Sequence, residues 1–202
     1  MSSDVDWLKT NSGNRFSKHA NIRGRRKIII SGMCVLSEKC TLFGDVAMKK
    51  DSDAAISMGL FCLLGVGCIL EPPQIGTRLD WPPGNITTKT AVYGSLTMGS
   101  FVLIRPHCEI RCRQIGRRVV VGRSVVLGRG SEVGDVVIID ANVRVPDRCK
   151  IPSFTRVQQH PNFDNAVTFT PLPSSFRKCI ENWCKQEYLG LIVDEEKIIQ
   201  EL

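Results

Sequence analysis

Histidine is the residue type in this sequence best suited to acid–base catalysis or zinc binding, because its imidazole exchanges protons near neutral pH and ligates metals. The chain contains three histidines, His19, His107 and His160, which are 88 and 53 residues apart. His107 follows an Arg-Pro pair, and nothing beside it is typical of a site for an acyl carrier or a nucleotide sugar. We therefore predict surface histidines, no catalytic residue, no bound metal and no cofactor.

Cysteine is the second residue type that could ligate zinc, and the chain has nine. Three of them, Cys112, Cys179 and Cys184, lie outside the repeat described below, and the last two lack the spacing of a C-x-x-C zinc motif. The first residues lack the apolar run of a secretory signal, so we expect reduced thiols in the cytosol. No apolar stretch approaches the roughly 18 residues of a membrane-spanning helix.

Positive charge is the remaining chemical feature. The formal net charge is +7, and residues 98–157 hold eleven Lys and Arg against five Asp and Glu. Three arginines that directly follow glycines in this stretch, Arg117, Arg123 and Arg129, are our candidates for partner binding, together with the adjacent Arg118. They predict either a solvated surface or a docking surface for an acidic protein or anionic lipid. No motif or interleaved aromatic residues indicate a nucleic acid partner.

An internal repeat of six residues predicts the elements that carry these side chains. An aliphatic residue returns at every sixth position from residue 115: Ile115, Val121, Leu127, Val133, Ile139, Val145, Ile151 and Val157. A glycine often follows the aliphatic residue and predicts a corner: Gly59, Gly65, Gly99, Gly116, Gly122, Gly128 and Gly134. Four places after the aliphatic residue comes a small or β-branched one, six times a cysteine: Cys34, Cys40, Cys62, Cys68, Cys108 and Cys149. We expect the aliphatic and cysteine positions to point inward as the core.

A period of six fits a very short strand followed by a corner. In Val119–Val121, alternation directs the first and third side chains inward and the middle one outward. Repetition of this unit builds an all-β solenoid whose turns pair about 4.8 Å apart. The alternative is a β-sandwich, but its strands return about every 8 to 12 residues and lack a fixed glycine column. The period leaves open the number of faces in each turn and the hand of the coil.

The solenoid has an interruption and a helical tail. A loop at about 71–97 leaves the repeat, and its Trp81 and Tyr93 either anchor a partner or fold back onto the coils. One apolar face predicts a helix after Ser174 or Ser175 that packs on the solenoid, and a second short helix begins at Asp194. The predicted parts are an N-terminal segment, the solenoid, an exit loop and a C-terminal helical segment, at residues 1–15, 16–157, 158–173 and 174–202.

The order of these segments resembles the dynactin subunit 5 family over roughly residues 10–160. The matching stretches are the opening TNSGNRFS at 10–17, LFGDVA at 42–47, the proline pair of Glu71-Pro72-Pro73, the restart at Gln114-Ile115-Gly116 after a five-residue repeat, Val145-Pro146, and IPSFT at 151–155. The sequence departs from the family at Phe43, where an arginine is usual, in a longer insertion around 74–97, and in a C-terminal extension. These departures affect a partner contact more than the fold.

The resemblance implies a left-handed parallel β-helix with three short faces in each turn and a C-terminal α-helical segment. It also implies a non-catalytic structural subunit at the pointed end of the dynactin complex, cytoplasmic and associated with the cytoskeleton. The implied partners are dynactin subunit 6 as a second β-helix, the pointed-end actin-related protein and the large zinc-binding pointed-end subunit, and the implied role is attachment of dynein and dynactin to cargo such as early endosomes. The alternative is a hexapeptide-repeat enzyme, either an acyltransferase or a relative of the gamma-type carbonic anhydrases.

Overall fold

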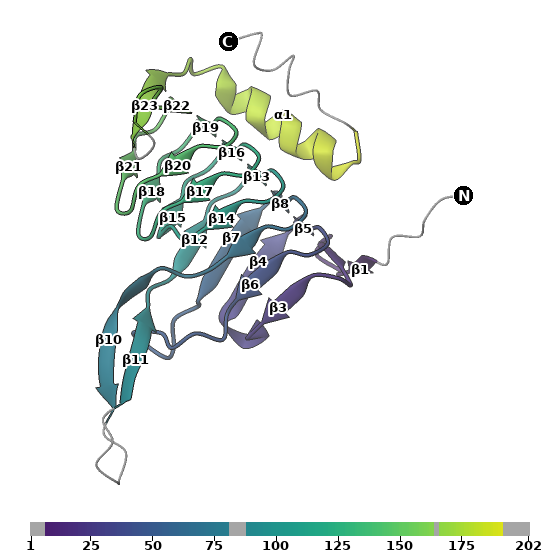
Figure 1. Cartoon of the computed structure of the whole chain (residues 1–202). Helices are drawn as coiled ribbons and strands as arrows, with labels where there is room; N and C mark the ends of the chain where they lie inside the picture. The colour runs from purple at the N-terminus through teal and green to yellow at the C-terminus, as the bar shows by residue number, and fades with distance from the viewer. Residues whose placement is uncertain (1–6, 81–87, 164–165, 192–202) are drawn as a thin grey trace.

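The computed structural model describes residues 7–80, 88–163 and 166–191, so Trp81 and the helix predicted from Asp194 lie outside the described residues. The repeat forms a column of stacked turns, and most turns add one short strand to each of three sheets (Figure 1). Neighbouring turns pair in parallel, as β13 pairs with β8 and β16. The fold is a left-handed parallel β-helix with one C-terminal helix, which confirms the predicted all-β solenoid.

The three sheets, named A, B and C here, form the three sides of the column. Sheet A contains, in spatial order, β1 (Trp7–Lys9), β2 (Arg15–Ser17), β5 (Val35–Leu36), β8 (Cys62–Leu64), β13 (Val102–Ile104), β16 (Val119–Val121), β19 (Val137–Ile139), β22 (Thr155–Gln159) and β23 (Val167–Pro171). Sheet B contains β3 (Asn21–Arg23), β6 (Thr41–Phe43), β9 (Ile69–Leu70), β14 (Glu109–Ile110), β17 (Val126–Leu127) and β20 (Arg144–Val145). Sheet C contains β4 (Ile28–Gly32), β7 (Ile56–Leu60), β12 (Leu96–Met98), β15 (Gln114–Ile115), β18 (Glu132–Val133) and β21 (Lys150–Ile151).

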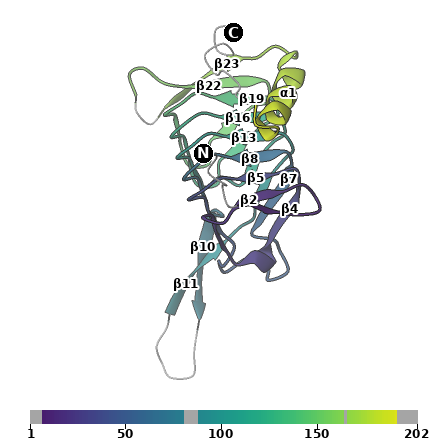
Figure 2. The same cartoon turned by 90° about the vertical axis from the view of Figure 1, so that its right-hand side faces the viewer.

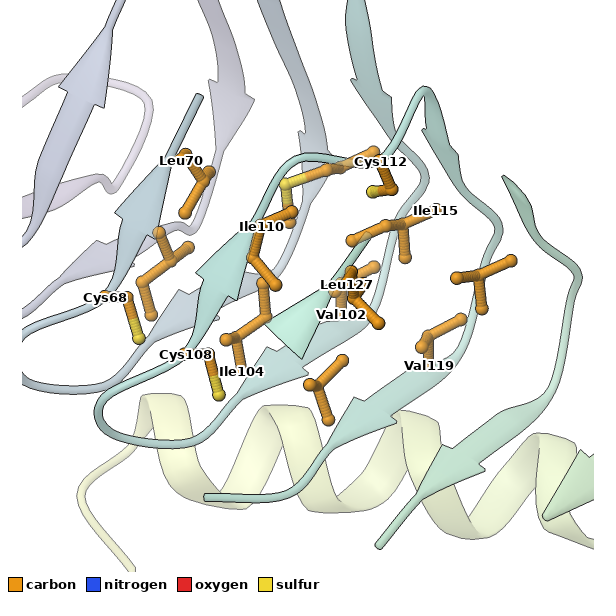
Figure 3. Packing of buried hydrophobic residues seen from close by; sticks show 14 of the residues in the cluster. Cys68, Leu70, Val102, Ile104, Cys108, Ile110, Cys112, Ile115, Val119 and Leu127 are labelled. Atoms are coloured by element: carbon orange, nitrogen blue, oxygen red, sulfur yellow. The ribbon is translucent and has the colours of Figure 1, made fainter. Parts of the chain in front are cut away.

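The core fills the inside of the column with the aliphatic and cysteine side chains of the repeat (Figure 3). The repeat's aliphatic residues are at most 3% exposed: Ile115, Val121, Leu127, Val133, Ile139, Val145 and Ile151. Five of the six repeat cysteines are fully buried: Cys34, Cys40, Cys62, Cys68 and Cys108. Cys149 is only half-buried, near the C-terminal end of the column. Cys112 lies outside the six-residue template yet is fully buried, because the shorter repeat between Ile110 and Ile115 turns it inward.

The corner glycines are required by close packing of the corners and not by the conformational freedom of their own backbone. None of the seven has a positive φ; the left-handed residue of each corner comes two positions later and is usually not glycine, as at Val136 with φ 58°. A Cβ on Gly116 would instead lie 2.4 Å from the carbonyl oxygen of Gly134 in the next turn. Close stacking of successive corners therefore excludes a side chain at these positions.

The excursion from the column contains an antiparallel hairpin of β10 (Gln74–Asp80) and β11 (Thr88–Tyr93), which projects from the body in both views (Figures 1 and 2). The repeat resumes with β12, whose Leu96 is fully buried. Both ends of sheet A are closed by antiparallel strands, β1 beside β2 and β23 beside β22. These strands cover the two edges of sheet A that an open solenoid would expose.

The helix α1 (Phe176–Tyr188) packs across the outer face of sheet A (Figure 2). Sheet A presents an outward apolar row that includes Leu63, Leu103 and Ile138, and α1 contributes buried Phe176 and Ile180 against it. Ser175 is the N-cap residue but makes no side-chain capping hydrogen bond. The tertiary contact therefore holds this helix more than its cap does.

Candidate functional site

The predicted arginines do not share one surface, because three repeats make one turn of the column. The chain passes from β15 in sheet C to β16 in sheet A, β17 in sheet B and β18 in sheet C. Arg117 therefore lies at the edge between sheets C and A, Arg123 at the edge between A and B, and Arg129 at the edge between B and C. Residues that stack on one edge are about 18 positions apart, as the Arg117 amide shows by donating to Asp135 Oδ1 at 2.7 Å.

Arg118 serves the fold and is not free to bind a partner. Its backbone adopts φ 59° at the edge between C and A, and its Nε forms an ion pair with Glu181 Oε1 on α1. A second ion pair joins Arg105 Nη1 to Glu187 Oε1 of α1 at 3.0 Å. Arg105 is only 11% exposed in its side chain, so this pair is partly shielded from solvent. Both pairs fix α1 against the outer face of sheet A.

The edge between sheets B and C, named the B–C edge, gathers arginines from successive turns. It comprises residues 111–113, 128–131 and 146–149. The Gly130 amide donates to the Arg111 carbonyl at 3.1 Å, and the Arg148 amide donates to the Arg129 carbonyl at 2.9 Å. These bonds stack the three arginine positions along the column axis. Of these three arginines, only Arg129 is predicted from the sequence as a partner-binding residue; a spacing of about 18 residues is the signal that identifies Arg111 and Arg148 as its neighbours on this edge.

A hollow of about 480 Å³ lies beside this edge on sheet B. Its apolar lining includes Val126, Leu127, Val145 and Pro146, and its polar lining consists of Arg111, Arg129, Arg144 and Asp147. Arg111 is already paired, with Glu71 at 3.0 Å and with Glu109 at 3.3 Å. The hollow thus combines an apolar floor with a mainly basic rim.

The N-terminal end of the column carries a second hollow, of about 390 Å³. Half-buried apolar side chains of the first turn line it, among them Phe16, Ile22, Ile28 and Ile30, together with Leu8, which is 54% exposed. The strands β3 and β4 form the outer edges of sheets B and C at this end. Within the described part of the chain, neither strand has a partner on its outer side.

Tyr93 lies at the base of the hairpin. Its amide donates to the Ala47 carbonyl at 2.8 Å, and its carbonyl accepts from the Lys49 amide at 3.0 Å. The ring is half-buried. Tyr93 therefore joins the hairpin to the column, and its aromatic partner in the prediction, Trp81, falls outside the described residues.

The histidines are spread over the column. His19 and His107 are exposed on the edge between A and B, and His107 has φ 63°. His160 is half-buried beyond the last turn, where its Nδ1 accepts from the Asn162 amide at 3.2 Å. In the described ranges no three His, Cys, Asp or Glu side chains are grouped so that they could hold a metal ion. The same ranges contain no helix of the length and apolar character needed to span a bilayer.

Comparison with known proteins gives one family and several solved structures. A family model described as dynactin subunit 5 matches residues 1–170. Among solved structures, the acetyltransferase domain of PglB from Neisseria gonorrhoeae is similar at 16% identity and a TM-score of 0.46, over 80% of this chain and 58% of that chain. A mutant of AntD, an N-acyltransferase from Bacillus cereus, is similar at 15% identity and a TM-score of 0.47, over 86% and 89%. A hexapeptide transferase family protein from Anaplasma phagocytophilum is similar at 14% identity and a TM-score of 0.43, over 91% and 96%.

Proposed function

The chain belongs to the dynactin subunit 5 family, and from this premise we propose that it is a non-catalytic structural subunit of the pointed end of the dynactin complex. The proposal includes a cytoplasmic location in association with the cytoskeleton and a role in attaching dynein and dynactin to cargo such as early endosomes. A stiff column suits this task, since each turn is hydrogen-bonded to its neighbours and little conformational entropy is lost on docking.

The open N-terminal end of the column is the observation that carries this proposal. Among the described strands nothing pairs with the outer edges of β3 and β4, which leaves them available for further pairing, and the apolar side chains of the first turn are only half-buried. A second β-helix has the shape to cover both features at once. We therefore propose dynactin subunit 6 as the partner at this end, with burial of apolar surface contributing about 25 cal/mol for each Å². The pointed-end actin-related protein and the large zinc-binding subunit are proposed to hold the other faces.

Co-expression with dynactin subunit 6 tests this assignment. Leu8→Glu places a charge on an exposed side chain of the hollow, and we expect it to abolish co-elution in size-exclusion chromatography. Phe169→Glu is the matched control, because Phe169 is 45% exposed on β23 at the opposite end. Both variants should retain the melting temperature of the parent. A folded Leu8→Glu protein that still co-elutes would contradict the end-on arrangement.

The enzyme alternative is tested separately. A hexapeptide-type acyltransferase would bind acetyl-coenzyme A, and a relative of the gamma-type carbonic anhydrases would bind zinc through histidines. We propose that the purified protein does neither. Calorimetric titration with acetyl-coenzyme A and metal analysis by mass spectrometry provide the measurements, and stoichiometric binding of either one would overturn the non-catalytic assignment.

A further inference from the structure

Three arginines at the B–C edge and the adjoining strand carry charge that no side chain in the described part of the chain neutralises. Arg129, Arg144 and Arg148 are exposed, and none forms a side-chain ion pair with any residue that the structure describes. The neighbouring acid, Asp147, uses Oδ1 to accept the Arg129 backbone amide at 2.7 Å. By contrast, other arginines near this edge are matched: Arg111 with Glu71 and Glu109, and Arg113 with Glu132 at 3.6 Å.

We propose that this edge is a docking surface for an acidic segment of a partner protein. The segment would place carboxylates against Arg129, Arg144 and Arg148, and an apolar side chain into the hollow lined by Val126 and Pro146. Arg guanidinium groups suit this role because they bind carboxylates through two parallel hydrogen bonds. Complementary charge at an exposed surface chiefly raises the association rate and the selectivity for acidic partners.

The shape of the column favours a protein segment over a membrane as the occupant. The β10–β11 hairpin connects β9 of sheet B to β12 of sheet C, so it leaves the column at this same edge. It projects well beyond the stacked turns (Figure 1). A flat bilayer would meet the hairpin before it reached the arginines, whereas an extended chain can lie along the edge. Nucleic acid bases bind proteins by stacking on aromatic side chains, and the residues that line the hollow include none, so a nucleic acid is disfavoured as the occupant.

This surface lies on the B–C edge of the last turns and is separate from the open N-terminal end, so the two proposals fail independently. The double variant Arg129→Glu/Arg144→Glu should lose the acidic ligand but keep co-elution with dynactin subunit 6. Arg117→Glu/Arg123→Glu is the matched control, since it makes the same change of charge on the other two edges of the same turn.

Fluorescence anisotropy with a labelled peptide of alternating Glu and Leu measures the interaction on the full chain. We expect the Arg129→Glu/Arg144→Glu protein to bind at least about tenfold more weakly, and the control protein to change by less than about threefold. Added salt should weaken binding of the parent, because these charges are exposed. Melting temperatures verify that both variants fold.

Several outcomes would overturn the proposal. These are equal weakening by both double variants, equal binding of a peptide in which Gln replaces Glu, and no binding of the Glu-Leu peptide to the parent protein. Tighter binding to vesicles of phosphatidylcholine and phosphatidylserine, or to single-stranded RNA, than to the Glu-Leu peptide would assign the edge to a different class of ligand.

Discussion

The hydroxyl of Tyr188 donates a hydrogen bond to the backbone carbonyl oxygen of Gly13 at 2.8 Å, and so joins the last residue of α1 to the segment before the first turn. The Tyr188 ring also packs edge-on against Phe61, with 5.7 Å between the ring centroids. At the start of α1, the Arg177 guanidinium lies 4.8 Å from the centroid of the Phe154 ring in the last turn. The helix α1 therefore spans the stacked turns and contacts both the last turn and the segment before the first, and we call it a strap for this reason.

Removal of the Tyr188 contacts should loosen this strap. Tyr188→Phe deletes one hydrogen bond and should lower the free energy of unfolding by about 1 kcal/mol. Tyr188→Ala also deletes the contact with Phe61 and with the Arg15 guanidinium, which lies 4.1 Å from the ring centroid, and should cost about 3 kcal/mol. Urea denaturation measures both. Equal stability of the two variants would mean that the ring contributes nothing beyond its hydroxyl.

A methyl group at a stacked corner should destabilise the column. Gly116→Ala would bring Cβ to 2.4 Å from the Gly134 carbonyl oxygen, and the two corners would have to separate. We expect a loss of at least about 2 kcal/mol, typical of overpacking. Gly76→Ala is the control, because no atom lies within 4 Å of its ideal Cβ. Thermal unfolding compares them, and a Gly116→Ala melting temperature equal to that of Gly76→Ala would refute the close-approach argument.

The inward positions of the fold could be predicted from the sequence because burial alone imposes them. Val121 and Leu127 lie six positions apart and point inward for any number of faces in a turn of the column, so a period of six is enough to place them in the core. Arg129 and Arg148 share an edge because three repeats make one turn of the column. The six-residue period of the sequence does not reveal how many repeats make a turn. Because three repeats make one turn, Arg117, Arg123 and Arg129, which occupy equivalent positions in the repeat, lie on three different edges of the column.

Two further side chains were beyond the sequence pattern for physical reasons. Cys112 is buried because the corner between β14 and β15 is one residue shorter, which changes the direction of its side chain. Arg118 looks like its exposed neighbour Arg117 in sequence, but α1 returns from about 60 residues away and provides Glu181 as its partner. Contacts between segments so distant along the chain are set by tertiary packing and leave no local periodicity.

A charge inside the column should prevent folding, whereas a charge one residue later should be tolerated. Val125 is fully buried, and Val125→Lys would place an ammonium group in an apolar core with no partner. We expect aggregation or loss of the β-sheet signal in circular dichroism. Val126, in β17, is only half-buried and faces outward, so Val126→Lys should remain folded with a change of about 1 kcal/mol or less. A soluble Val125→Lys protein with the parent melting temperature would contradict the inward assignment.

Alkaline pH should destabilise the protein through its buried thiols. Burial between α1 and the outer face of sheet A raises the pKa of Cys184 from its ordinary value of 9.0 to about 12, although the nearby Arg105 partly opposes the shift. The unfolded chain releases this proton first, so the stabilising effect of the neutral thiol is complete below pH 9.0 and is lost as the pH rises toward about 12. The slope is at most about 1.4 kcal/mol for each pH unit. Urea denaturation measures the free energy of unfolding at pH 8 and at about pH 10.5. The decrease between these two pH values should be smaller for Cys184→Ala than for the parent, by roughly 2 kcal/mol. Cys179→Ala, a change at a half-exposed thiol of the same helix, should keep the parent's loss; if Cys184→Ala keeps it as well, ionisation of Cys184 is not its source.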